Sequence, residues 1–265
     1  MDRFAFLSGL PRTGSTVLGT LLSQHPDLHP TATSVVRDQM NYIRKFSLGE
    51  SPYYNVKDLA SPVWGSMRGM LFGAYEAIRE EIVIEKDRGW ANDVELLRRL
   101  TGSNPKILSP VRPIPEIIAS FMLVSQGIGK QSKIENELRL AGRESNPWTL
   151  SRIIWEKYVY ASWRMFKAGY EANPDCFLLL EYGDIVTKPK ETVGAICEYL
   201  RVEPLVPTTT GLVNPNPEND MVYGLKGLHD VKPVLKKTSP PAWEILGDEC
   251  YELWHSRKLE FWECG

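Results

Sequence analysis

A short loop near the N-terminus combines two glycines, one cation and two hydroxyls. Gly9 and Gly14 bracket Arg12, and Ser15 and Thr16 follow directly. Glycine lets the backbone approach a ligand closely, and the planar fork of an arginine can bind a phosphate through two parallel hydrogen bonds. These residue types at this spacing predict a phosphate-binding turn.

The elements expected on either side of the loop support this interpretation. Residues 4–7 are an apolar run that predicts a buried strand, and the apolar residues within 17–22 recur at helical spacing. Strand, loop and helix in this order direct the loop amides and the positive end of the helix dipole toward one point. An ordinary strand-turn-helix without a ligand is the alternative, and the coincidence of glycines, a cation and hydroxyls argues against it.

The loop nearly fits the nucleoside-triphosphatase pattern G-x-x-x-x-G-K-[ST]. Gly9, Gly14 and Thr16 fall into register, but Ser15 stands where the pattern has its lysine. Because a P-loop ATPase uses that lysine on the β- and γ-phosphates, its loss argues against triphosphate chemistry. Arg12 provides a cation from within the loop instead. A P-loop nucleotide kinase stays an alternative that strict dependence of turnover on Mg·ATP would favour.

Two later segments each place a cation after a buried strand. Lys86 follows the apolar run 82–84, and Arg112 follows the run 107–111. Ligands gather outside the carboxyl ends of parallel strands, so both cations are expected in the crevice that holds the first loop. Ser120 lies eight residues beyond Arg112 on the next expected helix. Ser120 can face back toward the end of the strand only if the turn between them is tight. For Lys86, the alternative is a surface lysine in a turn.

The first loop resembles the 5′-phosphosulfate loop, P-[KR]-[ST]-G-[ST]-[ST], of sulfotransferases that use 3′-phosphoadenosine 5′-phosphosulfate (PAPS). The continuation through residues 21–27 is similar to tyrosylprotein sulfotransferases and related bacterial enzymes. The resemblance implies a donor-binding loop that consists of Pro11, Arg12, Thr13, Gly14, Ser15 and Thr16.

The same resemblance implies roles for both strand-end cations. Residues 85–90 resemble a family segment, [DN]-K-[DN]-x-x-W, whose lysine contacts the transferring sulfuryl group, and Lys86 matches that lysine. Arg112 and Ser120 match the arginine and serine that share the 3′-phosphate of the donor. Arg12 and Lys86 are therefore the expected catalytic cations.

Two further positions match donor-binding residues of the family. Tyr182 follows the apolar run 176–180 and resembles a tyrosine near the adenine, although a core tyrosine is an equal alternative. Lys232 matches the lysine of a Val-[IV]-Lys-Pro-Val element that covers the cofactor. Both are expected at the donor site.

The general base is the least defined part of the expected site. Tyrosylprotein sulfotransferases have a glutamate that acts as the base, and the matching position falls at Thr33, which cannot accept a proton near neutral pH. Asp38 and His29 are the catalytic candidates instead, with His25 also nearby. Asp38 alternatively favours the dipole of a helix over 34–45. A catalytically inactive nucleotide-binding or scaffold protein is therefore a further alternative.

Alternating helices and strands predict an α/β fold with a central parallel sheet and helices on both faces. The resemblance implies the sulfotransferase version of the P-loop nucleoside-kinase-like architecture. The 265-residue chain suits one domain, with acceptor-binding or lid insertions near 33–80 and 126–147. Long helices are expected over 148–170 and 241–261, the second packing against the sheet. Aromatic candidates for the acceptor pocket are Tyr53, Tyr54 and Trp64.

Composition excludes several partners. The formal net charge of −2 gives no sign of nucleic acid or an anionic membrane, so local basic residues must bind any anion. The sequence shows neither a signal-peptide pattern nor an apolar run of membrane-spanning length, and we expect a cytoplasmic protein. Four cysteines without C-x-x-C spacing argue against zinc.

The sequence thus predicts a PAPS-dependent sulfotransferase that needs no metal. It would move the sulfuryl group to an acceptor hydroxyl or amine by in-line displacement and release adenosine 3′,5′-bisphosphate (PAP). The acceptor stays open among a small molecule, a sugar, a lipid and a protein tyrosine, and a homodimer also stays open.

Overall fold

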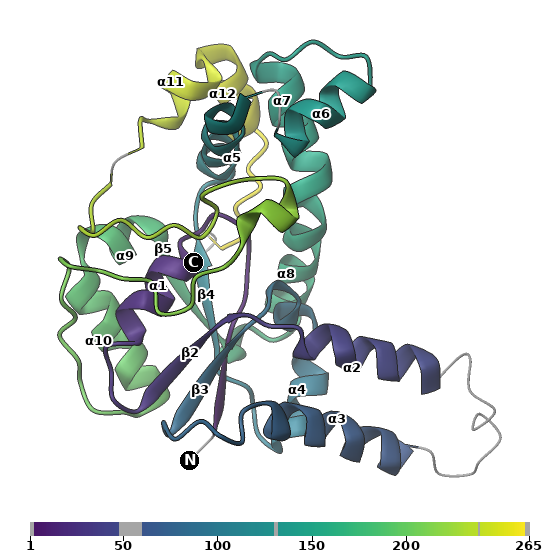
Figure 1. Ribbon diagram of the computed structural model, residues 1–265, viewed down its shortest axis with the longest axis vertical. Coiled ribbons are helices and arrows are strands. Elements are labelled where there is room, and N and C mark those ends of the chain that lie inside the picture. Colours follow the sequence, from purple (N-terminus) through teal and green to yellow (C-terminus); the bar gives the residue numbers. More distant parts are fainter. Residues whose placement is uncertain (1–2, 48–59, 130–131, 238, 263–265) are drawn as a thin grey trace.

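Five parallel strands form the central sheet of the computed structural model, which describes residues 3–47, 60–129, 132–237 and 239–262. Helices lie on both sides of this sheet (Figure 1). The arrangement confirms the predicted α/β class with a parallel sheet. In the spatial order β2-β3-β1-β4-β5, the strands are β2 (Leu28–Thr33), β3 (Ile82–Lys86), β1 (Phe4–Leu7), β4 (Ile107–Val111) and β5 (Phe177–Glu181).

Successive residues of the strands face two separate apolar cores. On β1, Phe4 and Phe6 belong to one core, whereas Ala5 and Leu7 belong to the other. This alternation follows from the period of two in a strand. Because both faces are covered, the strand is apolar throughout, which is why its sequence predicts a buried strand.

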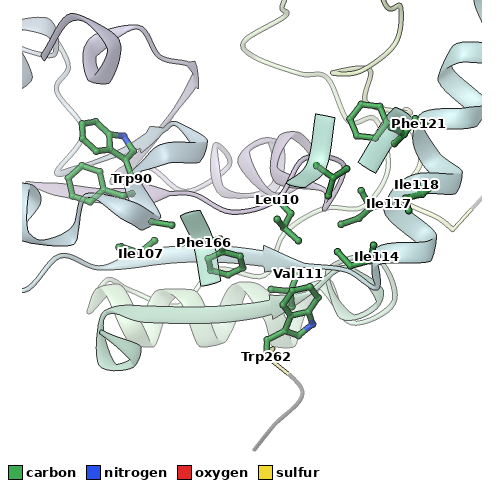
Figure 2. Close-up of a cluster of buried hydrophobic side chains, with 14 of the residues drawn as sticks. Leu10, Trp90, Ile107, Val111, Ile114, Ile117, Ile118, Phe121, Phe166 and Trp262 are labelled. Carbon is green, nitrogen blue, oxygen red and sulfur yellow. The ribbon is translucent and has the colours of Figure 1, made fainter. Parts of the chain in front are cut away.

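The larger core contains side chains from most of the helices. Figure 2 shows part of it, including Trp90, Phe166 and Trp262 together with Ile107 and Val111 of β4. The contributing helices are α2 (Val36–Lys45), α3 (Ala60–Ala74), α4 (Val94–Thr101), α5 (Ile114–Ile128), α6 (Lys133–Leu140), α7 (Pro147–Ile154), α8 (Tyr160–Ala172), α11 (Ala242–Leu246) and α12 (Asp248–His255). The smaller core is covered by α1 (Ser15–Leu22), α9 (Tyr182–Thr187) and α10 (Pro189–Leu200).

Two predicted long helices are interrupted. The helix expected over 148–170 contains a π-helical turn, η5 (Trp155–Val159), between α7 and α8. The helix expected over 241–261 is divided at Gly247, whose φ of 77° is unfavourable for most residues. The resulting α11 and α12 pack on α5 instead of the sheet, so that expectation was wrong.

The strand order creates a ligand-binding edge. The chain passes from β1 to the edge strand β2, returns through β3 beside β1, and then continues on the other side of β1. Ligands bind open α/β sheets at such a switch point, outside the carboxyl ends of the strands. Lys86 is paired with Leu7 of β1 on one side and with Thr33 of β2 on the other. The loop after β1 therefore starts at the same level as Lys86.

No helix in the described ranges is long and apolar enough to cross a membrane.

Candidate active site

Ser8 connects the loop after β1 to β4 and to the 3-10 helix η3 (Arg88–Asn92), which follows β3. Its hydroxyl donates to the carbonyl of Arg88 and accepts from the backbone N–H of Ala91, both at 2.9 Å. On the other side, the hydroxyl of Ser109 in β4 donates to the Ser8 carbonyl at 2.8 Å. These hydrogen bonds fix the start of the loop between η3 and β4.

The loop has a backbone that few residue types adopt. Gly9 and Gly14 have φ values of 150° and 91°, and Arg12 has a φ of 62°. A left-handed conformation costs a non-glycine residue about 1–2 kcal/mol, and such strain is concentrated at functional sites. Gly14 also allows a close approach, because a Cβ there would lie 2.7 Å from the ring of Tyr182. Helix α1 begins at Ser15 without a side-chain cap, so its first N–H groups are available to an anion.

Two arginines from different strand ends meet beside the loop. Arg12 Nε donates to Ser120 Oγ at 3.1 Å, and its guanidinium also donates to the carbonyl of Leu228. Arg112 Nη1 donates to the carbonyl of Arg12 at 3.2 Å. Burial, together with the charge of Arg112, lowers the pKa of Arg12 to about 10, so Arg12 stays protonated near neutral pH. Two neighbouring guanidinium groups repel each other, and an anion bound between them would relieve that repulsion.

Arg112 is almost fully buried, and it has two partners besides the carbonyl of Arg12. Its Nε lies 3.0 Å from Glu116 Oε2, and its guanidinium carbon lies 4.3 Å from the ring centroid of Tyr182. Only Arg112 and Pro113 separate β4 from α5, and Ser120 lies about two turns along this helix. Arg112 and Ser120 line the same cavity, as expected from their spacing.

This cavity has a volume of about 350 Å³, within the usual range of small-molecule sites. It also includes residues that the sequence analysis left without a role, among them Arg88 and His229. All ten predicted donor-binding residues line it: Pro11, Arg12, Thr13, Gly14, Ser15, Thr16, Arg112, Ser120, Tyr182 and Lys232. The structure thus brings these residues together, and their individual roles stay predictions.

Lys86 lines the cavity with its ammonium group in an ion pair. Its Nζ lies 2.9 Å from Glu218 Oε1, and both side chains are 11% exposed. Burial lowers the pKa of Lys86, although the negative charge of Glu218 opposes this effect. The Lys86 backbone N–H donates to Thr31 Oγ1 at 3.0 Å, which orders the end of β3 beside β2.

A cluster of titratable groups beside Lys86 was missed by the sequence analysis. Glu218 Oε1 accepts hydrogen bonds from the backbone N–H and the hydroxyl of Thr33, both at 3.1 Å. Glu218 Oε2 lies 3.6 Å from His229 Nε2, and His229 Nδ1 lies 2.5 Å from Asp220 Oδ1. Only the fold brings these groups to Lys86. The single local signal was that His229 belongs to the same short element as the predicted Lys232.

The predicted base candidates lie elsewhere. His29 is near the amino end of β2, where it pairs with Val83 of β3 and lies 3.4 Å from Glu80. The carboxyl end of β2 faces the cavity, so His29 lies at the opposite end of the strand. Asp38 is exposed in the first turn of α2, the position that suits a carboxylate at a helix dipole. Neither side chain lines the cavity, and the role of either as the base stays a prediction.

The other candidates have structural surroundings. The buried His25 lies with its Nε2 2.8 Å from the carbonyl oxygen of Glu203. Trp64 on α3 is half-buried beneath the guanidinium of Arg99, at 4.9 Å from its ring centroid. Tyr53 and Tyr54 lie outside the described residues.

The solved structures to which this chain is similar include three sulfotransferases. A search of curated proteins finds no match. The sulfotransferase domain of the curacin biosynthetic pathway has a TM-score of 0.45 and 20% identity, covering 76% of this chain and 74% of its own. The sulfotransferase domain of the Synechococcus PCC 7002 olefin synthase has a TM-score of 0.45 and 19% identity, covering 96% and 87%. A sulfotransferase from Alicyclobacillus acidocaldarius has a TM-score of 0.47 and 17% identity, covering 81% and 87%.

The sequence profile of the sulfotransferase family matches residues 5–206 of the 265-residue chain. The match begins in β1 and continues beyond α10, and it includes the loop, Lys86, Arg112 and Ser120. The predicted family is thereby confirmed, while a specific relation to tyrosylprotein sulfotransferases stays a prediction. The chain belongs to the sulfotransferase family.

Proposed function

We propose that this protein transfers the sulfuryl group of PAPS to an acceptor hydroxyl or amine. One observation carries the proposal: Arg12 and Arg112, from two strand ends, meet beside Ser120 and line one cavity with Lys86. One cluster of cations would be enough to bind a ligand with a single phosphate. A donor with anionic groups at two places suits cations distributed along a cavity.

The residues present fit this donor. Its 5′-phosphosulfate would bind to the loop amides, the free N–H groups of α1 and Arg12. These groups place positive charge at the loop, where the glycines let a ligand approach the backbone closely. Arg112 and Ser120 would bind the 3′-phosphate and so distinguish PAPS from ATP. The ring of Tyr182 is half-buried between Gly14 and Arg112 and offers a flat face to the adenine.

Catalysis would depend on positive charge placed before the reaction begins. When bound, the donor supplies a sulfuryl group that the acceptor attacks in line, and negative charge builds on the bridging oxygen. Lys86 and Arg12, together with the loop amides, provide fixed charge and donors for that oxygen. Lys86 suits this role because it is level with the start of the loop and largely shielded from water.

Calorimetric binding of PAP, beside ADP with and without Mg²⁺, tests the donor site. We expect PAP to bind without metal and more tightly than ADP. Arg112→Ala should weaken PAP binding about 30-fold, or about 2 kcal/mol, because it removes a charge-assisted contact with the 3′-phosphate. Arg112→Lys should recover only part of this loss, since lysine keeps the charge without the fork.

Arg152 provides a matched control. It pairs with Glu156 at 2.7 Å on an exposed helix face, in the same i,i+4 relation that Arg112 has to Glu116. Arg152→Ala should leave PAP binding unchanged. Equal affinities of the wild-type protein for PAP and ADP, or tighter binding of Mg·ADP, would exclude the proposed donor and favour a nucleotide kinase.

A further inference from the structure

We propose that Glu218 is the general base that removes the acceptor proton during sulfuryl transfer, an assignment that rests on the proposed function. Glu218 lies in the irregular segment between α10 and the 3-10 turn η7 (Asp220–Tyr223). Its carboxylate reaches the carboxyl ends of β2 and β3 through Thr33 and Lys86.

The position of the carboxylate meets the geometric requirement for a base. A general base must lie within a hydrogen bond, or one bridging water, of the proton that it removes. Glu218 Oε1 lies 2.9 Å from Lys86 Nζ, the cation assigned to the sulfuryl group. The acceptor atom must approach that same group, so Glu218 lies beside the place where the acceptor proton is released.

The surroundings of Glu218 keep it ionised and fixed. Burial alone would raise its pKa, but Lys86, Thr33 and His229 together lower it, so Glu218 is a carboxylate at neutral pH. Two hydrogen bonds from Thr33 hold one carboxylate oxygen in place. When Lys86 turns to the anionic sulfuryl group, it withdraws less charge from Glu218, and the carboxylate becomes a better proton acceptor.

Glu218 contacts the cavity-lining residues Thr33 and Lys86, whereas His229 lines the cavity itself. The ring of His229, however, is already engaged. Its Nδ1 lies 2.5 Å from Asp220 Oδ1, and its backbone N–H donates to Asp220 Oδ2 at 3.0 Å. Its Nε2 faces Glu218 Oε2 at 3.6 Å. Because both ring nitrogens face carboxylates, His229 and Asp220 act as positioning residues for Glu218. Within the described part of the chain, no group of three or more His, Cys, Asp and Glu side chains is arranged to bind a metal ion.

With a hydroxyl acceptor, one proton and one sulfuryl group change partners. The acceptor proton passes to a carboxylate oxygen of Glu218 as an oxygen lone pair forms the new S–O bond. The bond between sulfur and the bridging oxygen breaks, and its electron pair stays on the 5′-phosphate of PAP. The protonated Glu218 then returns its proton to water.

Glu218→Gln tests the assignment because it keeps the size of the side chain and its acceptor oxygen while removing the basic group. Calorimetry would measure the binding of PAP and PAPS, and PAP release from PAPS would measure turnover. Turnover would be followed with water alone and with phenols that are either ionised or un-ionised at the assay pH. Glu203→Gln is the matched control, because Glu203 is exposed in the same irregular segment.

We expect Glu218→Gln to bind PAP within a few-fold of wild type and to bind PAPS at least as tightly, since a negative charge beside the sulfuryl group is gone. Turnover with water and un-ionised phenols should fall about 10²- to 10⁴-fold, the usual contribution of a general base. Ionised phenols need no base and should lose far less. His229→Gln should lower turnover less than Glu218→Gln while keeping the same difference between ionised and un-ionised phenols.

Turnover of Glu218→Gln within five-fold of wild type would overturn the assignment. So would an equal loss with ionised and un-ionised phenols, or a loss of PAP binding, because either result indicates a structural role. A larger effect in His229→Gln than in Glu218→Gln would make His229 the base. Failure of the wild-type protein to bind PAP or to consume PAPS would instead refute the proposed function itself.

Discussion

Glu85, which directly precedes Lys86, is expected to make the protein less stable as the pH rises through the weakly acidic range. Its side chain is fully buried. One carboxyl oxygen accepts from Trp90 Nε1, and the other lies 3.4 Å from the hydroxyl of Tyr75. Burial is the main reason that the pKa of Glu85 is raised from its ordinary 4.5 to about 7. The folded protein therefore keeps this group neutral where the unfolded chain ionises it.

The magnitude follows from proton linkage. Below pH 4.5 both states bind the proton, and above about pH 7 neither does, so the free energy of unfolding changes only between these values. In that window only the folded state binds the proton, and stability falls as the pH rises. A pKa difference of about 2.5 corresponds to a loss of about 3 kcal/mol, since each pKa unit is worth about 1.4 kcal/mol.

Urea unfolding of the wild type and Glu85→Gln at pH 5 and pH 8 measures this loss. Glutamine can accept from Trp90 and donate to Tyr75 without a titratable proton. The stability of Glu85→Gln relative to wild type should rise by about 2 to 3 kcal/mol between the two pH values, and the contributions of other groups cancel in this difference. Glu81→Gln, at an exposed neighbouring position, should show no such rise. Parallel curves for wild type and Glu85→Gln would refute the argument that Glu85 is neutral in the folded protein.

Three further changes test the construction of the site. Gly14→Ala should weaken PAP binding at least about 10-fold, because a positive φ and a 2.7 Å contact with Tyr182 both oppose a Cβ; unchanged calorimetric affinity would contradict this. Lys86→Met should slow PAPS turnover by about 10²-fold or more while PAP affinity stays within a few-fold, and turnover near the wild-type rate would remove Lys86 from the mechanism. Gly169→Ala should lower the free energy of unfolding by about 2 kcal/mol or more, because a Cβ would clash with the Ala91 carbonyl oxygen, which outweighs a gain of about 1 kcal/mol in helix propensity. An unchanged urea midpoint would show that α8 tolerates the added methyl group.

The donor side of the site could be predicted from sequence because its signals are local. A strand, a loop and a helix are contiguous around Arg12, and each of Lys86 and Arg112 directly follows its own apolar run. Once the strands are parallel, their carboxyl ends must meet at one edge. The local sequence pattern and the parallel topology together were enough to predict that these three cations line one cavity.

The cluster around Glu218 could not be predicted because its contacts are remote in sequence. Thr33 has no acidic group of its own, and nothing near it indicates that Glu218 lies against it. The segment that carries Glu218 has neither helical nor strand periodicity, so its path over the cavity depends on tertiary contacts. An isolated antiparallel bridge between Thr210 and Val234 is one such contact, and the hydrogen bond from Arg12 to Leu228 is another.

The site therefore divides between two parts of the chain. The family profile ends at residue 206, within which Arg12, Lys86 and Arg112 all lie, whereas Glu218 and His229 come after it. Each of these three cations already has an internal partner: Ser120 for Arg12, Glu116 for Arg112 and Glu218 for Lys86. Such contacts restrict the side chains before an anion arrives, so less conformational entropy is lost on binding. Glu218, the partner of Lys86, comes from the segment beyond the family match, and so does Leu228, whose carbonyl accepts from Arg12. The cations for the proposed donor thus lie within the part of the chain that matches the family, whereas the proposed base lies beyond it.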